Sequence, residues 1–147
     1  MSIEQPANAN VLAHLGRGGV VPPFSWYRDF GGDAYYEAGC HPDIVQRLWD
    51  QIGVALPRDC RSLVCGVPAL THPDSGVILA VGMGTQYCLK LDAPLAEAAL
   101  VVGARSSMRW SDGTTTDLGV VFGAGWVFGG WLSQEPEWCR ETFEALG

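Results

Sequence analysis

Residues 63–91 read LVCGVPALTHPDSGVILAVGMGTQYCLKL, and this stretch decides the fold. It holds three short apolar runs separated by segments that contain glycine. Between the first two runs, Pro73 presets φ, Asp74 can cap the turn with its side chain, and Gly76 can take a positive φ. Apolar runs bounded by such turns predict a three-strand β-meander. The predicted strands are 63–67, 77–81 and 87–91.

Three helices are predicted around the meander. Residues 43–52 place apolar side chains at helical spacing, while Arg47 and other polar residues occupy the opposite face. We expect Leu48, Trp49 and Ile52 to be buried against the meander. The other two predicted helices are 94–102 and 137–146.

Two further strands are predicted after the meander. Residues 105–110 precede Asp112 and Gly113, a pair typical of a tight hairpin turn, and residues 126–131 form an aromatic strand. Strands that follow one another with few crossovers favour antiparallel pairing. The predicted fold class is therefore α+β: a mostly antiparallel sheet of five or six strands, with two or three helices packed on one face.

The size of the chain predicts one domain. With 147 residues, of which 48% are hydrophobic, it can bury a sizeable core. We expect a single α+β domain over residues 1–147, with the polar residues 1–8 flexible.

The charge of the chain argues against two classes of partner. The net charge is −7, with only 9 Lys and Arg residues, which disfavours contact with nucleic-acid phosphates. No apolar run approaches the roughly 20 residues of a membrane span, and the N-terminus has no leader pattern. We therefore expect a cytoplasmic protein that binds neither nucleic acid nor membrane.

The chain carries no cofactor or metal motif. Its five cysteines are odd in number and poorly spaced for zinc, so we expect free thiols. The glycines at 82 and 84 lack the third glycine of a dinucleotide fingerprint and are interpreted as a bend. No residue is assigned a catalytic role, and neither a cofactor nor a metal is expected.

The order of these elements resembles a known family. An apolar strand at 77–81, the "LKL" strand at 87–91, a short helix ending in Gly103, a Gly-Trp strand at 125–127 and a closing helix follow one another. Over residues 63–146 this order resembles the small α+β domains of the YjbR and TfoX N-terminal type. The resemblance implies the topology. It also implies DNA binding, which the acidic charge of this chain disfavours.

An aromatic segment, residues 24–37, is the candidate functional site. It mixes aromatic rings with a few charges, as ligand pockets and interface hot spots do. The same rings could instead close the open face of the sheet. We predict a small binding domain for an unidentified small molecule or protein. The candidate binding residues are Phe24, Trp26, Tyr27, Arg28, Asp29, Asp33, Tyr35, Tyr36 and Glu37.

Two alternative functions and one assembly stay open. The first is a small cofactor-independent enzyme, with carboxylates or the Cys40–His41 pair between residues 29 and 41 at its centre. The second is an acidic protein that neutralises a basic partner through the last helix, whose solvated face is the plainer interpretation. A homodimer through a sheet edge or an aromatic patch is also considered. The acidic residues of that helix are Glu135, Glu137, Glu141 and Glu144.

Overall fold

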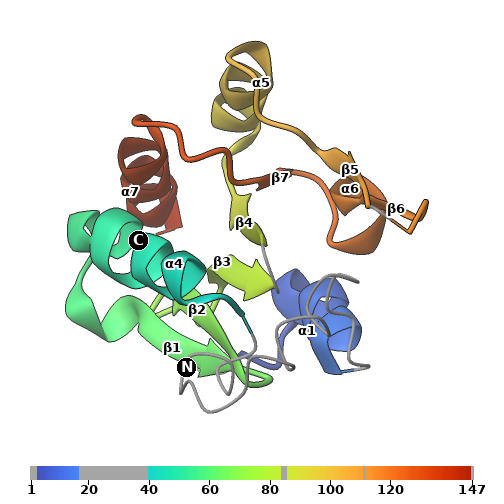
Figure 1. The fold of residues 1–147 in the computed structure, drawn as a ribbon. Helices are drawn as coiled ribbons and strands as arrows, with labels where there is room; N and C mark the ends of the chain where they lie inside the picture. The colour runs from blue at the N-terminus through green and yellow to red at the C-terminus, as the bar shows by residue number, and fades with distance from the viewer. Residues whose placement is uncertain (1–2, 17–39, 84–85, 111, 147) are drawn as a thin grey trace.

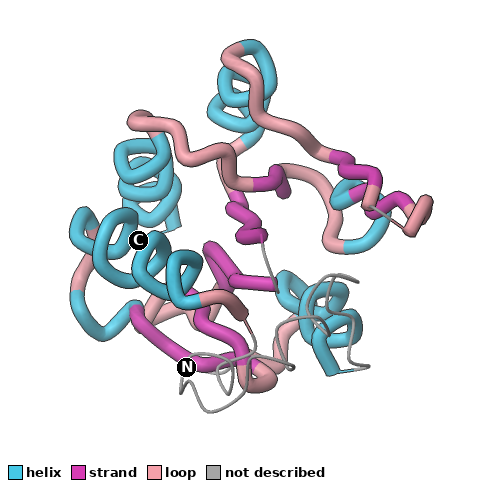
Figure 2. Tube along the Cα trace, in the orientation of Figure 1, coloured by secondary structure: helices cyan, strands magenta, loops and turns pink. Residues whose placement is uncertain are grey.

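A computed structural model describes residues 3–16, 40–83, 86–110 and 112–146 of the chain. Five strands form one antiparallel sheet in the order β1-β2-β3-β4-β7, and β5 and β6 form a separate hairpin (Figures 1 and 2). This confirms the predicted α+β class. The strands are β1 (Arg61–Val64), β2 (Val67–Thr71), β3 (Ile78–Met83), β4 (Gln86–Lys90), β5 (Ser107–Arg109), β6 (Thr115–Asp117) and β7 (Trp126–Phe128).

Helical segments surround the sheet. The longest is α7 (Glu135–Leu146), and α4 (Pro42–Gln46) continues directly into the π-helical segment η3 (Arg47–Ile52). The others are η1 (Pro6–Asn8), α1 (Ala9–Gly16), η4 (Gly53–Ala55), η5 (Arg58–Cys60), α5 (Ala93–Val101) and α6 (Leu118–Val121). None of the helices in the described ranges is both long enough and apolar enough to cross a membrane.

Each face of the sheet carries its own buried cluster. On one face, α4, η3, α5 and α7 pack against Leu79 and Leu89. Leu48 and Ile52 are fully buried there as expected, whereas Trp49 is only partly buried. On the other face, α1, α6 and the β5–β6 hairpin cover Ile78. The helices predicted for one face are therefore present, and α1 and α6 cover the second face.

The first predicted strand, 63–67, is wrong. It is a hairpin in which Cys65 and Gly66 both take positive φ values, 50° and 81°, between β1 and β2. A two-residue turn of this kind usually carries Asn-Gly or Asp-Gly, so Cys-Gly inside an apolar run gave no turn signal. The correction adds one strand to the predicted meander.

Two other strand limits differ from the prediction. Gly82 does not end its strand but lies within β3, where a Cβ would come 2.9 Å from Cys40 Sγ and 3.0 Å from Pro68 Cγ. Glycine is therefore the residue that lets the chain before α4 lie close to the sheet. The predicted strand 126–131 stops at Phe128, and Trp131 takes a φ of 58°.

Side-chain hydrogen bonds attach residues 3–8 to the rest of the fold. The side chain of Asn8 is buried, donates to the carbonyl oxygens of Ile3 and Gly76, and accepts from the N–H of Ile78. Gln5 donates to the carbonyl of Ser75. These bonds attach the N-terminal segment to the turn between β2 and β3.

Candidate functional site

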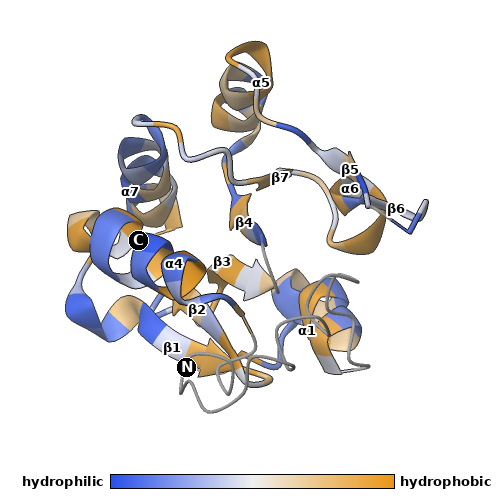
Figure 3. Ribbon diagram, in the orientation of Figure 1, coloured by the Kyte–Doolittle hydropathy of each residue, from blue (hydrophilic) through white to orange (hydrophobic). Residues whose placement is uncertain are grey.

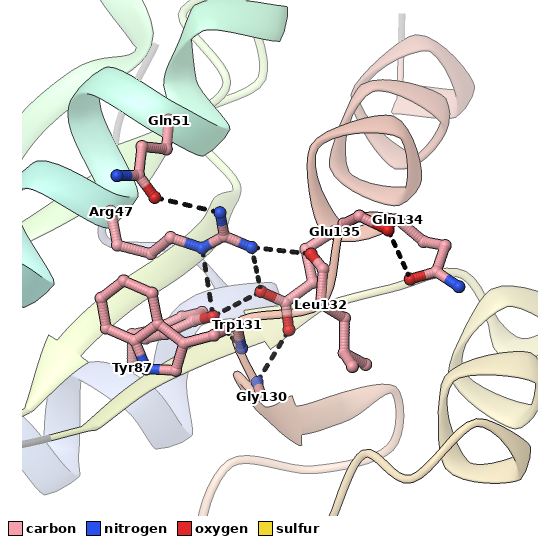
Figure 4. Close-up of polar contacts among 9 residues, drawn as sticks. Arg47, Gln51, Tyr87, Gly130, Trp131, Leu132, Gln134 and Glu135 are labelled. Carbon is pink, nitrogen blue, oxygen red and sulfur yellow. Dashed lines mark hydrogen bonds and ion pairs between the residues drawn. The ribbon is translucent and has the colours of Figure 1, made fainter.

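A buried polar cluster joins three elements that are far apart in the sequence. Arg47 comes from η3, Tyr87 from β4 and Glu135 from the first turn of α7, and Figure 4 shows their side chains converging. The side chain of Glu135 is only 1% exposed and that of Arg47 10%. We call these three residues the buried triad.

Hydrogen bonds within the triad are direct. Arg47 Nη2 lies 2.9 Å from Glu135 Oε1, which also accepts the hydroxyl proton of Tyr87. Arg47 Nε donates to the Tyr87 hydroxyl oxygen at 3.3 Å, and Arg47 Nη1 donates to Gln51 Oε1 at 3.1 Å. The ion pair therefore has hydrogen-bonded partners on both sides, as a buried pair requires.

The triad also holds the loop between β7 and α7. The N–H of Gly130 donates to Glu135 Oε2 at 2.8 Å, the N–H of Trp131 donates to the Tyr87 hydroxyl at 2.8 Å, and the carbonyl of Leu132 accepts from Arg47 Nη2 at 2.7 Å. Three successive residues of the loop are thus bonded to the triad (Figure 4).

Trp131 lies on the outside of this cluster in a strained conformation. Its φ of 58° is in the left-handed region, which costs a residue other than glycine roughly 1–2 kcal/mol. The residue is 50% exposed. Its ring meets Tyr87 edge-on at 5.5 Å, and the guanidinium carbon of Arg47 lies 5.5 Å from the ring centre. Tyr87 and Arg47 therefore contact the indole from the protein side, while half of the Trp131 surface faces solvent.

Burial and hydrogen bonding shift the pKa values of Tyr87 and Arg47. Burial, reinforced by the hydrogen bond to Glu135, raises the pKa of the Tyr87 hydroxyl well above its usual value. The pKa of Arg47 is raised by its bonds to Glu135 and Tyr87, although burial acts against that shift. The triad is thus an ion pair bridged by a neutral phenol.

Each polar side-chain atom of the triad already has a hydrogen-bond partner within the protein. The Tyr87 hydroxyl donates once and accepts twice, which is its full capacity. Within the described ranges, no buried side-chain nitrogen or oxygen lacks a hydrogen-bond partner. The triad therefore positions the loop and offers no free base or nucleophile.

Of the site residues proposed from the sequence, the structure describes Cys40 and His41 but not the aromatic segment. The aromatic segment 24–37, with all nine candidate binding residues, lies outside the described residues. Cys40 is buried, and burial raises the pKa of its thiol to about 12, which is the opposite of a reactive thiolate. His41 caps α4 by accepting from the N–H of Asp43. The thiol of Cys40 is therefore protonated at neutral pH, and Nδ1 of His41 is engaged in the helix cap.

Much of α7 is hydrophilic (Figure 3), but the acidic face predicted for this helix is smaller than expected. Glu135 belongs to the buried triad and does not face solvent. Glu137 and Glu144 both pair with Arg140, which lowers the pKa of Glu137. Only Glu141 is left of the four proposed carboxylates. Glu135 lies four residues before Cys139 and seven before Thr142, so it shares their buried face of α7, which begins two residues earlier than predicted.

The described residues also form hollows at the surface, of which two are considered as binding sites. A hollow of about 310 Å³ lies against α4 and η3, and a smaller one of about 160 Å³ lies between α5 and β7. Among the residues that the structure places, no three His, Cys, Asp or Glu side chains gather as metal ligands. The larger hollow is lined by Pro42, Asp43, Val45, Gln46, Trp49 and Asp50.

Comparison of the chain with family models, curated proteins and solved structures finds no match in any of the three. The resemblance to YjbR and TfoX N-terminal domains therefore stays a prediction.

Proposed function

We propose that this chain is a binding domain that recognises its partner through aromatic side chains. Trp131 is the contact residue on the described surface, and the aromatic segment 24–37 is the further contact predicted from the sequence. The observation that carries the proposal is the conformation of Trp131, a strained and half-exposed tryptophan held by the buried triad.

Strain at an exposed aromatic residue supports a role in binding. A left-handed backbone persists only where the surrounding structure holds it in place, and such residues cluster at functional positions. Tryptophan is also enriched among the few residues that dominate binding energy. A rigidly held ring loses little entropy when a partner packs on it, so affinity gains from this arrangement.

The alternatives have less support. For an enzyme, the triad offers no free acid, base or nucleophile, and Cys40 is buried. For an acidic neutralising protein, one of the four proposed carboxylates is buried and two are paired within their own helix. A homodimer, a cytoplasmic location and the absence of nucleic-acid binding stay part of the proposal as predictions.

The test compares partners retained by immobilised chain from a cell extract. The variants are Trp131→Ala and Trp26→Ala, with Val120→Ala as the control because Val120 is an exposed apolar residue on α6. We expect Trp131→Ala to lose a protein that the wild type and the control retain. Retention of every wild-type partner by Trp131→Ala would contradict the role of Trp131.

Thermal melts of the same variants separate a binding residue from a core residue. If Trp26 belongs to the contact surface, Trp26→Ala keeps the stability of the wild type and loses the partner. If Trp26 fills the core, the substitution costs roughly 3–5 kcal/mol. That second result would remove segment 24–37 from the proposal and leave Trp131.

A further inference from the structure

The smaller hollow, of about 160 Å³, lies where α5 ends and β7 ends. Glycines and alanine form much of its wall, and Phe128 and Met108 add apolar surface. Drug-sized molecules occupy pockets of about 300–1,000 Å³, so this hollow suits a ligand of few heavy atoms. Its lining residues are Gly103, Ala104, Arg105, Met108, Phe128, Gly129 and Gly130.

Arg105 is the charged residue of this wall, and its backbone is fixed. The N–H of Phe128 donates to the carbonyl of Arg105 at 2.7 Å, and the two residues form a β-bridge. The residue is exposed, and in the described part of the chain its guanidinium forms neither an ion pair nor a hydrogen bond. An arginine that lines the hollow on a fixed backbone therefore keeps its guanidinium donors free of partners among the described residues.

The backbone N–H groups of the small residues in the wall already donate hydrogen bonds to other parts of the protein. The N–H groups of Gly103 and Ala104 donate to the carbonyls of Leu100 and Ala99, at 3.3 Å and 2.9 Å. The N–H of Gly129 donates to the carbonyl of Tyr87, and that of Gly130 to Glu135. These amides cannot form an anion-binding nest, so the guanidinium is the donor group that this part of the wall offers a ligand.

We propose that this hollow binds a small monocarboxylate with a short apolar tail. A single guanidinium matches the two oxygens of one carboxylate through a pair of parallel hydrogen bonds. Phosphate carries more charge and more acceptors than one arginine satisfies, and the chain's net charge of −7 disfavours polyanions. Met108 and Phe128 supply the surface on which the tail packs.

The inference goes beyond the proposed function and does not depend on Trp131. Its test is a titration of ¹⁵N-labelled protein with sodium pentanoate, followed through the amide signals of the wall. We expect saturable shifts of the Gly103, Ala104, Gly129 and Gly130 signals, with a Kd on the order of 1–10 mM for so small a ligand. Pentanamide is expected to give no saturable shift at the same concentrations.

Two arginine variants give a matched comparison. Arg105→Gln should weaken pentanoate binding at least about tenfold, which is the loss of one charged hydrogen-bonding partner. Arg109→Gln changes the net charge equally, on exposed β5, but does not line the hollow, and should bind as the wild type does. Met108→Ala should weaken pentanoate binding more than acetate binding, because only pentanoate has a tail to pack.

Three results would overturn the inference. The first is the absence of any saturable shift with pentanoate. The second is an equal effect of Arg105→Gln and Arg109→Gln, which would show general electrostatic attraction. The third is tighter binding of inorganic phosphate than of pentanoate, which would show the wrong class of anion. Both arginines are exposed, so their replacement is expected to leave the fold intact.

Discussion

Replacing Glu135 by Gln tests the buried triad, because this substitution removes the negative charge and leaves the size of the side chain nearly unchanged. The carboxylate accepts from Tyr87, from Arg47 and from the N–H of Gly130. A glutamine has one oxygen and one NH₂ group. Whichever way the amide is turned, its NH₂ faces an N–H donor, either that of Gly130 or that of Arg47.

The magnitude follows from burial. Removing one partner of a buried ion pair leaves the other charge uncompensated and costs about 3–5 kcal/mol. Arg47 and Glu135 are 10% and 1% exposed, so this range applies. We therefore expect Glu135→Gln to lower the free energy of unfolding by about 3–5 kcal/mol, a large part of the 5–15 kcal/mol of an ordinary domain.

Glu137→Gln is the control on the same helix. Glu137 pairs with Arg140 at the surface, and the substitution makes the same chemical change and the same change in net charge. A surface pair contributes about 0–1 kcal/mol, so urea denaturation should show a small effect for this variant. A loss below about 1 kcal/mol for Glu135→Gln, equal to that of the control, would refute the triad as a buried pair.

Three more predictions concern the core and the pH dependence of stability. Leu48 is fully buried, so Leu48→Ala should lower the free energy of unfolding, measured in urea, by about 2–5 kcal/mol. A loss below about 0.5 kcal/mol would mean that Leu48 does not lie on the buried face of this helix. Gly129→Ala places a Cβ inside the ring of Tyr87, so this variant should lose at least about 2–3 kcal/mol of unfolding free energy or fail to fold. A melting curve equal to that of the wild type would contradict the packing of Gly129 against Tyr87. Burial raises the thiol pKa values of Cys40 and Cys139 to about 12 and that of Cys60 to about 11, from 9.0, so their contribution to stability is complete below pH 9 and is lost as the pH rises toward 12. At pH 10 the fully buried thiols of Cys40 and Cys139 should each remove roughly 1 kcal/mol of stability, which urea titrations at pH 8 and pH 10 measure. Cys139→Ala should reduce the loss by that amount, and equal stability at both pH values would contradict the buried thiols.

The fold was largely predictable because its signals are local. The turn at His72 to Gly76, the helical spacing of 43–52 and the Asp112-Gly113 hairpin each depend on residues close in sequence. His72 shows the limit of such signals. It caps the turn by accepting from the N–H groups of Asp74 and Ser75, but its ring is also buried and stacked on Phe143, which lies far away in the sequence.

The candidate site was not predictable because its partners are far apart in the chain. Arg47 is 40 residues from Tyr87 and 88 from Glu135, and no local pattern links such positions. The π-helical geometry of η3 also changes which residues share a face, since its bonds join residues five apart, and Arg47 and Ile52 are both buried. One signal was present, namely the pair Gly129-Gly130 after an aromatic strand, which marks a close approach of the backbone.

The most direct test of the account compares Trp131→Gly with Trp131→Ala. Both variants lose the indole, so their difference in unfolding free energy reports the backbone at this position. At an ordinary position alanine is more stable than glycine by about 0.5–1 kcal/mol. With the φ of 58° imposed by the triad, we predict that glycine is the more stable variant, by about 1 kcal/mol. If alanine proves the more stable, Trp131 is not held in the left-handed conformation, and the structural basis of the proposed contact is wrong.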